Sequence, residues 1–382
     1  MKSLVRVLLL ASAGVALGGC GLWGGSDEIQ PSELVEFEAE KQVEVLWQAR
    51  IGDGPGEAFH QFIPAVGAER VFAASRDGVV TALSRESGDE LWEVDLDTTL
   101  SAGAGEGFGT LVVADESGLV IALDASSGEE LWRHTVSSEV VAQPQVNADL
   151  VVVQVINGQV AAFDRVTGES LWTFDSQIPQ LSLRGTGAPV LTEQVTLAGF
   201  ANGKIIAIDN RNGMPIWEQR VSSSEGRSEL ERIADVDGRP LVFNGSVYVA
   251  GYQGQLISLN PYAAQITWSQ DFSSYRSLAA GFGNIYAVSA DDEVAAFDAN
   301  SSASVWQQSD LRYRQLTSPA VLGTTVVVGD NLGFLHFMSQ IDGHFVARYD
   351  YGDSGLLSDP VVVDDTLYVL GNDGRLSALK LN

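Results

Sequence analysis

Cysteine is almost absent from this sequence, and basic residues are scarce. The 382-residue chain has one cysteine, so it can form neither an internal disulfide nor a cysteine-based structural zinc site. Its 22 lysines and arginines stand against 50 aspartates and glutamates, which gives a formal net charge of −28. Nucleic acids and anionic bilayers are bound through clustered Lys and Arg, so both are excluded as the main partner. An apolar fraction of 45% excludes wholesale disorder.

The N-terminus carries an apolar run that is too short to cross a membrane. Lys2 and Arg6 precede apolar residues over 7–17, which is the pattern of a secretory signal peptide. The single cysteine ends the sequence Leu17-Gly-Gly-Cys20, which resembles the lipobox of bacterial lipoproteins. The resemblance implies cleavage before Cys20 and acylation of its thiol. The alternative is an ordinary signal peptide with a cysteine at this position by chance.

The lipobox divides the N-terminal region into two predicted parts. Residues 1–19 are the signal peptide, and residues 20–42 are a lipidated tether with six acidic residues between positions 27 and 40. Several acyl chains on one protein hold it stably on a bilayer. Lipoproteins of this type with Asp after the cysteine are retained in the inner membrane. Gly21 therefore predicts the outer membrane, with the protein facing the periplasm.

A short cassette of alternating apolar residues recurs through the rest of the chain. Each copy opens with a turn residue, and neighbouring copies are 38 to 51 residues apart. The eight copies begin at Gly78, Gly118, Gly158, Gly203, Gly254, Asp292, Gly333 and Gly374. Each copy predicts a strand, a turn and a second strand, and the residues before it supply two more strands. Four strands in a unit of about 40 residues are typical of a β-propeller blade.

Two residue types in the cassette have predicted roles. The glycines supply the positive φ that tight hairpin turns require. A tryptophan stands fourteen residues after the start of each of the first six copies, and Ala347 takes its place in the seventh. Tryptophan side chains bury ~150–250 Å² each, so these rings are predicted to fill the wedges between adjacent blades.

The eighth copy predicts how the ring closes. The chain ends at Asn382, before the last strand of that copy could form. Residues 43–51 have the pattern of the missing strand, including Trp47 at the tryptophan position. We therefore expect an all-β, eight-bladed propeller over residues 43–382, with antiparallel four-stranded blades and the last blade completed by the N-terminal strand. Closure of this kind removes free sheet edges.

The cassette Gly-x-apolar-x-Ala-apolar-Asp, followed by a turn glycine and Trp, resembles the repeat of PQQ-type propellers over residues 43–382. Together with the lipobox and the acidic tether, it resembles the BamB family of lipoproteins, which act in the assembly of outer-membrane β-barrel proteins. This resemblance implies a non-catalytic scaffold without a cofactor. The implied partners are the POTRA domains of BamA and, through BamA, the other lipoproteins of the BAM complex. Nascent β-barrel proteins are a further expected class of partner.

Two connections between blades are predicted to carry the binding site. Blade spacing rises to 45 and 51 residues around 174–186 and 222–238, and long loops on a rigid scaffold often bind partners. The stretches Leu181-Ser-Leu-Arg184 and Asp235-Val-Asp237 resemble segments through which BamB proteins contact BamA.

In that interpretation, Leu181 and Leu183 are apolar anchors and Arg184 is a charged contact. Asp235 and Asp237 either orient Arg184 or meet a basic group of the partner. From the residues alone, a solvated loop with tucked leucines and turn-forming aspartates is the alternative.

A periplasmic PQQ-dependent dehydrogenase is the alternative function. Such enzymes often carry a vicinal cysteine pair, which a chain with one cysteine cannot form. The recurring aspartates Asp124, Asp164, Asp209 and Asp298 follow the repeat, which indicates turn residues rather than a catalytic site. His336 and His344 are eight residues apart across a hairpin, and we interpret them as exposed strand residues rather than metal ligands. No catalytic residue, cofactor site or metal site is predicted.

Overall fold

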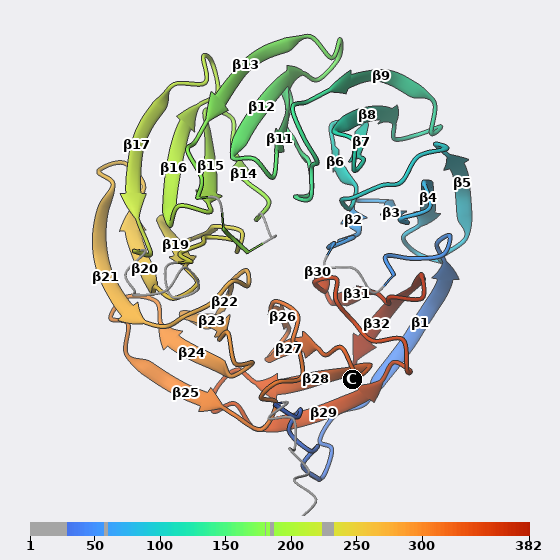
Figure 1. The fold of residues 1–382 in the computed structure, drawn as a ribbon. Helices are drawn as coiled ribbons and strands as arrows, with labels where there is room; N and C mark the ends of the chain where they lie inside the picture. The colour runs from blue at the N-terminus through green and yellow to red at the C-terminus, as the bar shows by residue number, and fades with distance from the viewer. Residues whose placement is uncertain (1–28, 57–59, 180, 184–186, 224–232) are drawn as a thin grey trace, which may run out of the picture. The chain divides into compact units, whose positions relative to one another are not determined.

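The computed structural model describes residues 29–56, 60–179, 181–183, 187–223 and 233–382. These residues form 32 strands in eight antiparallel four-stranded sheets, which are arranged as a ring (Figure 1). The predicted eight-bladed propeller is therefore confirmed. Among the described residues, no helix has the length and hydropathy that a membrane span needs.

The first four blades each contain four consecutive strands, which follow one another from the inside of the ring outward. Blade 1 is β2 (Ala65–Val66), β3 (Arg70–Ala74), β4 (Val79–Ser84) and β5 (Glu90–Asp95). Blade 2 is β6 (Gly105–Gly107), β7 (Thr110–Ala114), β8 (Leu119–Asp124) and β9 (Glu130–Thr135). Blade 3 is β10 (Gln145–Val146), β11 (Leu150–Gln154), β12 (Gln159–Asp164) and β13 (Ser170–Asp175). Blade 4 is β14 (Val190–Leu191), β15 (Val195–Phe200), β16 (Lys204–Asp209) and β17 (Pro215–Arg220).

The next three blades follow the same order, and the eighth takes its outer strand from the N-terminal part of the chain. Blade 5 is β18 (Leu241–Phe243), β19 (Ser246–Ala250), β20 (Gln255–Asn260) and β21 (Gln265–Asp271). Blade 6 is β22 (Ala279–Gly281), β23 (Asn284–Val288), β24 (Val294–Asp298) and β25 (Ser304–Gln308). Blade 7 is β26 (Ala320–Leu322), β27 (Thr325–Gly329), β28 (Phe334–Ser339) and β29 (Phe345–Asp350). Blade 8 is β30 (Val361–Val363), β31 (Thr366–Leu370), β32 (Arg375–Leu381) and β1 (Val43–Arg50).

The ring closes through β1, as the sequence predicts. This strand pairs antiparallel with β32, from Val43 opposite Leu381 to Arg50 opposite Arg375. At the start of the pair, the backbone N–H of Gln42 donates to Asn382 O (3.2 Å) and the N–H of Asn382 donates to Gln42 O (2.9 Å). The compact body of the protein begins at Pro31, so it also includes residues that precede β1.

Tryptophans connect seven of the eight blades to the following blade. The indole of Trp47 in β1 donates from Nε1 to Arg85 O of blade 1 (3.0 Å), and its ring lies against Gly88. A Cβ on Gly88 would come within 2.6 Å of that ring, so the glycine is required by packing as well as by its φ of 74°. The same bond to the following blade is made by Trp92, Trp132, Trp172, Trp217, Trp268 and Trp306. The predicted filling of the wedges is confirmed.

The one missing tryptophan has a topological explanation. Each tryptophan contacts the turn between the third and fourth strands of the following blade. Blade 8 has no such turn, because its third strand ends the chain and its fourth strand is β1. Ala347, buried in β29, faces this interface, and no indole is needed there.

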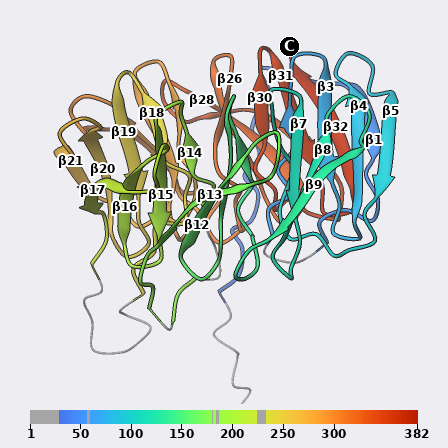
Figure 2. The same cartoon turned by 90° about the horizontal axis from the view of Figure 1, so that it is seen from above.

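The strand order gives the ring two distinct faces. The loop face carries the connections from the outer strand of one blade to the inner strand of the next, for example 176–189 and 221–240. The loop face also carries the turn between the second and third strands of each blade. The turn face carries the turns between the first and second strands and between the third and fourth strands, together with the C-terminus (Figure 2).

Proline marks the entry to the inner strands, which are sheet edges. Six of the 11 prolines directly precede an inner strand: Pro64, Pro144, Pro189, Pro240, Pro319 and Pro360. A residue without an N–H is tolerated there because no ladder hydrogen bond is lost.

Candidate partner-binding site

Long connections collect on the loop face around blades 3 to 5. Residues 176–189 join β13 to β14, and residues 221–240 join β17 to β18. These are the two connections that blade spacing singled out. A third long connection, residues 51–64, joins β1 to blade 1; repeat spacing could not reveal it, because β1 is separated in sequence from the rest of its blade.

A hydrogen bond brings the two predicted segments together. The backbone N–H of Leu183 donates to the Asp235 carboxylate, which is fully buried. Leu181 is 43% exposed and Leu183 is half-buried. Arg184 lies outside the described residues. The segments of blades 3–4 and 4–5 therefore meet through the side chain of one aspartate.

Two carboxyl groups lie close together in this region without a cationic partner among the described residues. Burial raises the pKa of Asp235 to about 6, although the N–H of Leu183 opposes the shift. Burial, and then the charge of Asp235, raise the pKa of Asp237 well above its usual value. The second carboxylate oxygen of Asp235 has no hydrogen-bond partner in the described part of the chain. Unpaired buried carboxylates favour a nearby cation.

Sequence reasoning missed an aromatic group beside Asp235. The N–H of Tyr252 donates to Asp235 O (2.7 Å), and the rings of Tyr252 and Tyr275 lie 6.2 Å apart, edge to face. The guanidinium of Arg276 lies 4.7 Å from the centroid of the Tyr275 ring. Tyr and Arg are enriched among the residues that dominate interface energy. Tyr252 lies in the turn between β19 and β20 and Tyr275 in the connection between β21 and β22, so no pattern in the sequence signals their contact.

A histidine on the third connection belongs to a hydrogen-bonded chain. Ligand atoms of His60, Glu116 and Glu139 lie within 4.8 Å of one another, as a metal site would require. However, Arg76 donates to Nδ1 of His60 (3.0 Å) and also contacts Glu116. Because arginine only donates, His60 carries its proton on Nε2 and donates it to Glu139 (3.0 Å). Arg76 already occupies Nδ1 of His60 and offsets the charge of Glu116, so the geometry fits an ion-pair network better than a divalent cation.

The interpretation of His336 as an exposed residue is wrong. Its side chain is fully buried in β28, and Nε2 lies 2.9 Å from the carboxylate of Asp330. The alternation of the strand places this side chain between the sheets, where buried Asp330 and the guanidinium of Arg348 supply its polar contacts. His344 is exposed, as expected.

The recurring aspartates are turn residues, as predicted. The carboxylate of Asp164 accepts the backbone N–H groups of Val166 (3.0 Å) and Thr167 (2.8 Å), which lowers its pKa. Asp124 and Asp298 accept the equivalent bonds in their own blades. These carboxylates stabilise the hairpins.

Comparison with known proteins decides the family. The sequence profile described as "Outer membrane protein assembly factor BamB" matches residues 76–308. The Pseudomonas aeruginosa protein of the same name is 50% identical over 370 residues, which cover 97% of each chain. This chain belongs to the BamB family. The crystal structure of BamB from Moraxella catarrhalis agrees, with a TM-score of 0.82 and 27% identity over 89% of this chain and 100% of that one.

Membership of the BamB family confirms the predicted function in outer-membrane protein assembly and the non-catalytic interpretation. A quinohemoprotein alcohol dehydrogenase from Comamonas testosteroni also has a similar structure, with a TM-score of 0.70 over 88% of this chain and 76% of that one. Its sequence identity is 13%, so this similarity concerns the propeller fold alone. The dehydrogenase alternative is therefore set aside in favour of the BamB family.

Proposed function

We propose that this BamB-family chain is a lipid-anchored scaffold that binds the POTRA domains of BamA through its loop face. Through BamA it meets the other lipoproteins of the complex and assists the folding of β-barrel proteins into the outer membrane. Cys20 carries the acyl chains after removal of residues 1–19. Residues 20–42 link it to the propeller of residues 43–382, which faces the periplasm.

The hydrogen bond between Leu183 and Asp235 is the main observation that supports this binding site. It ties two long connections into one surface, on which Leu181 is exposed and Leu183 is half-buried. Leu181 and Leu183 are the apolar anchors of the proposed interface, and Arg184 is its charged contact. The fully buried side chain of Asp235 accepts the hydrogen bond of Leu183 and so holds this segment in place.

The charge of the site favours a partner with a basic group. Asp235 and Asp237 have raised pKa values and no cationic partner among the described residues. Either Arg184 or a basic side chain of the POTRA domain would pair with them. Such pairing lowers the cost of burying the two carboxylates, and it makes binding sensitive to salt.

The test exchanges the anchors and measures binding and folding together. The variants are Leu181→Ala with Leu183→Ala, and separately Arg184→Glu, each assayed by co-purification with BamA and by thermal unfolding. Leu131→Ala is the matched control, because Leu131 is 47% exposed on the outer strand of blade 2, away from these loops.

We expect the double variant to weaken binding at least about 30-fold, since truncation of an interface anchor costs roughly 2 kcal/mol or more. The control should bind as the unchanged protein does, and all melting curves should coincide. Full binding by the double variant and by Arg184→Glu would refute the proposed surface. Lost binding with an early melting transition would show that these residues act only in folding.

A further inference from the structure

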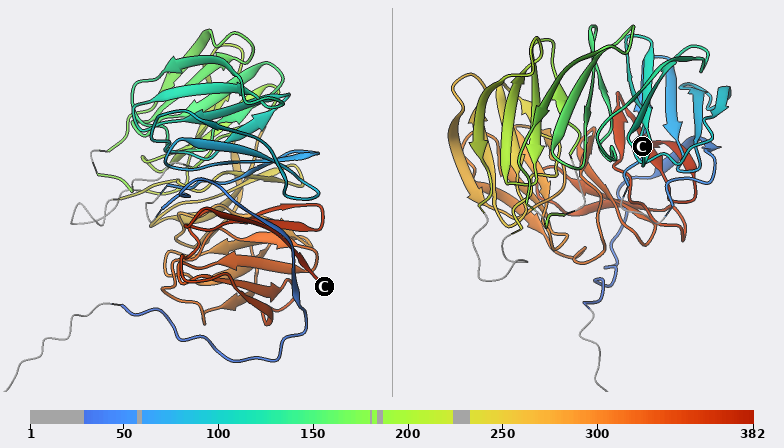
Figure 3. Two further views of the ribbon diagram at one scale, coloured as in Figure 1. Left: turned by 90° about the vertical axis from the view of Figure 1, so that its right-hand side faces the viewer. Right: turned by 45° about the horizontal axis from the view of Figure 1, so that its top comes forward.

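The chain that precedes β1 follows the outside of blade 7 from one face of the propeller to the other. At the loop face, the N–H of Ser32 donates to Arg312 O (2.9 Å) in the connection between β25 and β26. At the turn face, Gln42 exchanges backbone hydrogen bonds with Asn382. Figure 3 (left) shows this described segment in blue, running along the edge of the ring before it turns into β1. We call residues 32–42 the strap.

Two arginines of the propeller hold backbone carbonyl groups of the strap. Arg314 donates from Nη1 to Ser32 O (2.9 Å), and Arg348 donates from Nη1 to Val35 O (3.0 Å). Further along, the N–H groups of Glu40 and Lys41 donate to Val346 O (2.9 and 3.1 Å). The strap is therefore hydrogen-bonded to blade 7 at both ends and in its middle.

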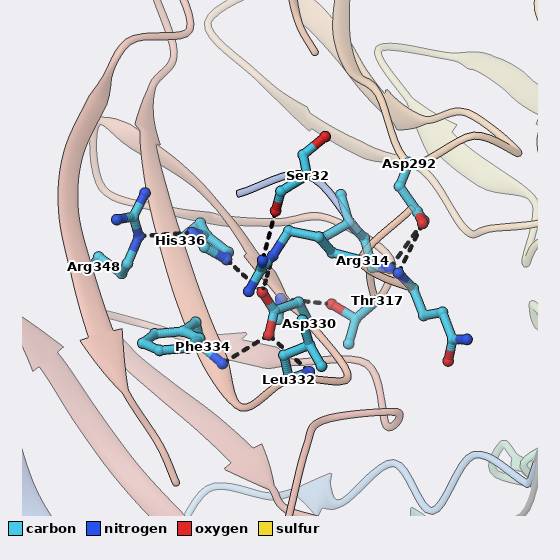
Figure 4. Close-up of polar contacts among 12 residues, drawn as sticks. Ser32, Asp292, Arg314, Thr317, Asp330, Leu332, Phe334, His336 and Arg348 are labelled. Carbon is cyan, nitrogen blue, oxygen red and sulfur yellow. Dashed lines mark hydrogen bonds and ion pairs between the residues drawn. The ribbon is translucent and has the colours of Figure 1, made fainter. Parts of the chain in front are cut away.

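The arginines are fixed by a buried polar cluster (Figure 4). Arg314 donates to Asp330 (2.6 Å), which also accepts from Nε2 of His336 (2.9 Å). Arg348 donates from Nε to Nδ1 of His336 (3.2 Å), so this histidine is neutral and links the second arginine to the aspartate. Asp330 and His336 are fully buried. A buried network of this kind positions the two guanidinium groups before the strap binds them.

Apolar side chains of the strap add to the core between blades 6 and 7, which also contains Trp306. Leu34 and Phe37 pack against the core between blades 6 and 7, and the Phe37 ring lies 5.5 Å from the Phe345 ring. The Arg348 guanidinium lies 5.0 Å from the centroid of the Phe37 ring. These contacts add dispersion and cation–π attraction to the hydrogen bonds.

The strap covers an outer-strand position that is exposed elsewhere. In most blades the residue before the tryptophan is apolar and exposed to solvent: Leu91 is 49% exposed, Leu131 47% and Leu171 48%. Val346 holds the same position in β29 and is only 4% exposed. The strap therefore occupies a site that the propeller forms in blade 7 and not in those blades.

The route of the strap decides on which face the upstream chain leaves the propeller. Strand β1 starts at the turn face, so without the strap the chain would enter from that side. With the strap bound, the chain enters at Ser32 on the loop face. Ser32 is twelve positions after Cys20. An extended chain spans at most ~3.3–3.6 Å per residue, so the reach from the anchor to Ser32 is at most about 43 Å.

We infer that the strap orients the propeller on the membrane, with its loop face toward the lipid surface to which the chain is anchored. This inference rests on the proposed acylation of Cys20. It gives the scaffold a fixed orientation, in which the surface of Leu181 and Leu183 lies on the membrane-proximal side. A propeller held only through the turn face by 22 residues would have roughly twice the reach and the opposite preferred orientation.

The experiment compares the two faces of blade 6 in the acylated full-length protein on vesicles. A new cysteine replaces Asp291 on the loop face or Asn300 on the turn face; both residues are exposed in hairpin turns of this blade. A fluorophore on that thiol reports energy transfer to a labelled lipid. The release variant is Leu34→Ser with Phe37→Ser, and the matched control is Val35→Ser, whose side chain is 37% exposed.

We expect transfer from position 291 to exceed that from position 300 at least twofold in the unchanged protein and in the Val35→Ser control. The release variant should lose or reverse the difference while it remains bound to the vesicles. Equal transfer from both positions in the unchanged protein, or a difference that persists in the release variant, would overturn the inference.

A second measurement separates the strap from the anchor. In the soluble Cys20→Ser chain, hydrogen exchange at the amides of Ser32, Glu40 and Lys41 should be slowed at least tenfold relative to the release variant. Fast exchange at all three amides would refute strap binding. If exchange is slowed in this chain but the unchanged protein is not acylated and does not bind vesicles, strap binding stands, and the anchor and the membrane orientation are refuted.

Discussion

Gly88 offers a direct test of how adjacent blades are joined. Its φ is 74°, and an added Cβ would lie 2.6 Å from the Trp47 ring, which is only 8% exposed. Gly88→Ala therefore has two costs. The left-handed conformation costs an alanine ~1–2 kcal/mol, and overpacking against a fixed ring costs a further ~1–3 kcal/mol. We expect a total loss of about 2–5 kcal/mol in the free energy of unfolding.

Two variants separate these costs. Gly109 has a φ of 78° and no atom within 4 Å of an added Cβ, so Gly109→Ala should lose only the ~1–2 kcal/mol of the conformational cost. In a Trp47→Ala background the ring is gone, and Gly88→Ala should again cost only that amount. The coupling between the two sites is then about 1–3 kcal/mol.

The assay is urea unfolding of the four members of the cycle and of the Gly109 control, followed by tryptophan fluorescence and circular dichroism. Ala264 and Ser302 occupy the same turn position in blades 5 and 6 with φ of 52° and 63°, so this position does accept a Cβ elsewhere in the ring. If Gly88→Ala costs no more than Gly109→Ala, or if the cycle shows no coupling, the glycine serves the turn alone and the packing argument fails.

Two further predictions concern the closure and the site. A chain that begins at Gly52 lacks β1 and Trp47 and should be destabilised by at least ~3–5 kcal/mol, the usual cost of truncating a buried tryptophan; an unchanged thermal transition would contradict the closure. The pKa of Asp235 is raised to about 6 in the folded protein, so the folded state binds more protons than the unfolded state between about pH 4 and 6. Its contribution to stability should therefore fall as pH rises through that range, and Asp235→Asn should flatten this dependence in pH-resolved thermal unfolding; an identical pH profile for the variant would contradict the assignment.

The internal repeat made the fold predictable from the sequence. Eight similar cassettes determined the number of blades, and the missing last strand predicted the partner of β32 at residues 43–51. The structure gives β1 as Val43–Arg50. Such inference works because each blade is a local unit that repeats the same turn and packing requirements.

Features that occur once in the ring were harder to predict. The alternation of apolar residues in β28 predicts only on which face of the sheet the side chain of His336 lies. Its burial depends on the polar network with Asp330, Arg314 and Arg348, which forms only in the folded protein. The strap has the composition of a solvated acidic tether, because its acidic residues are exposed and only Leu34 and Phe37 turn inward. Tyr252 and Tyr275 meet from different loops. Contacts of this kind depend on tertiary geometry, and a single sequence carries no pattern that signals them.

The tryptophan contacts give the ring a direction, as in a cyclic assembly built from head-to-tail interfaces. Each blade offers an indole to one neighbour and a turn to the other, so a blade cannot be inverted, and a set of such units closes only when the rotation per unit suits their number. Seven of these interfaces are alike, and the one at Ala347 differs. The residue at each interface therefore depends on where the chain ends lie. A circular permutant that joins Asn382 to Gln42 and opens at the same turn of another blade would leave one tryptophan without a turn to contact. At the original position, the new turn of blade 8 would face Ala347 in place of an indole.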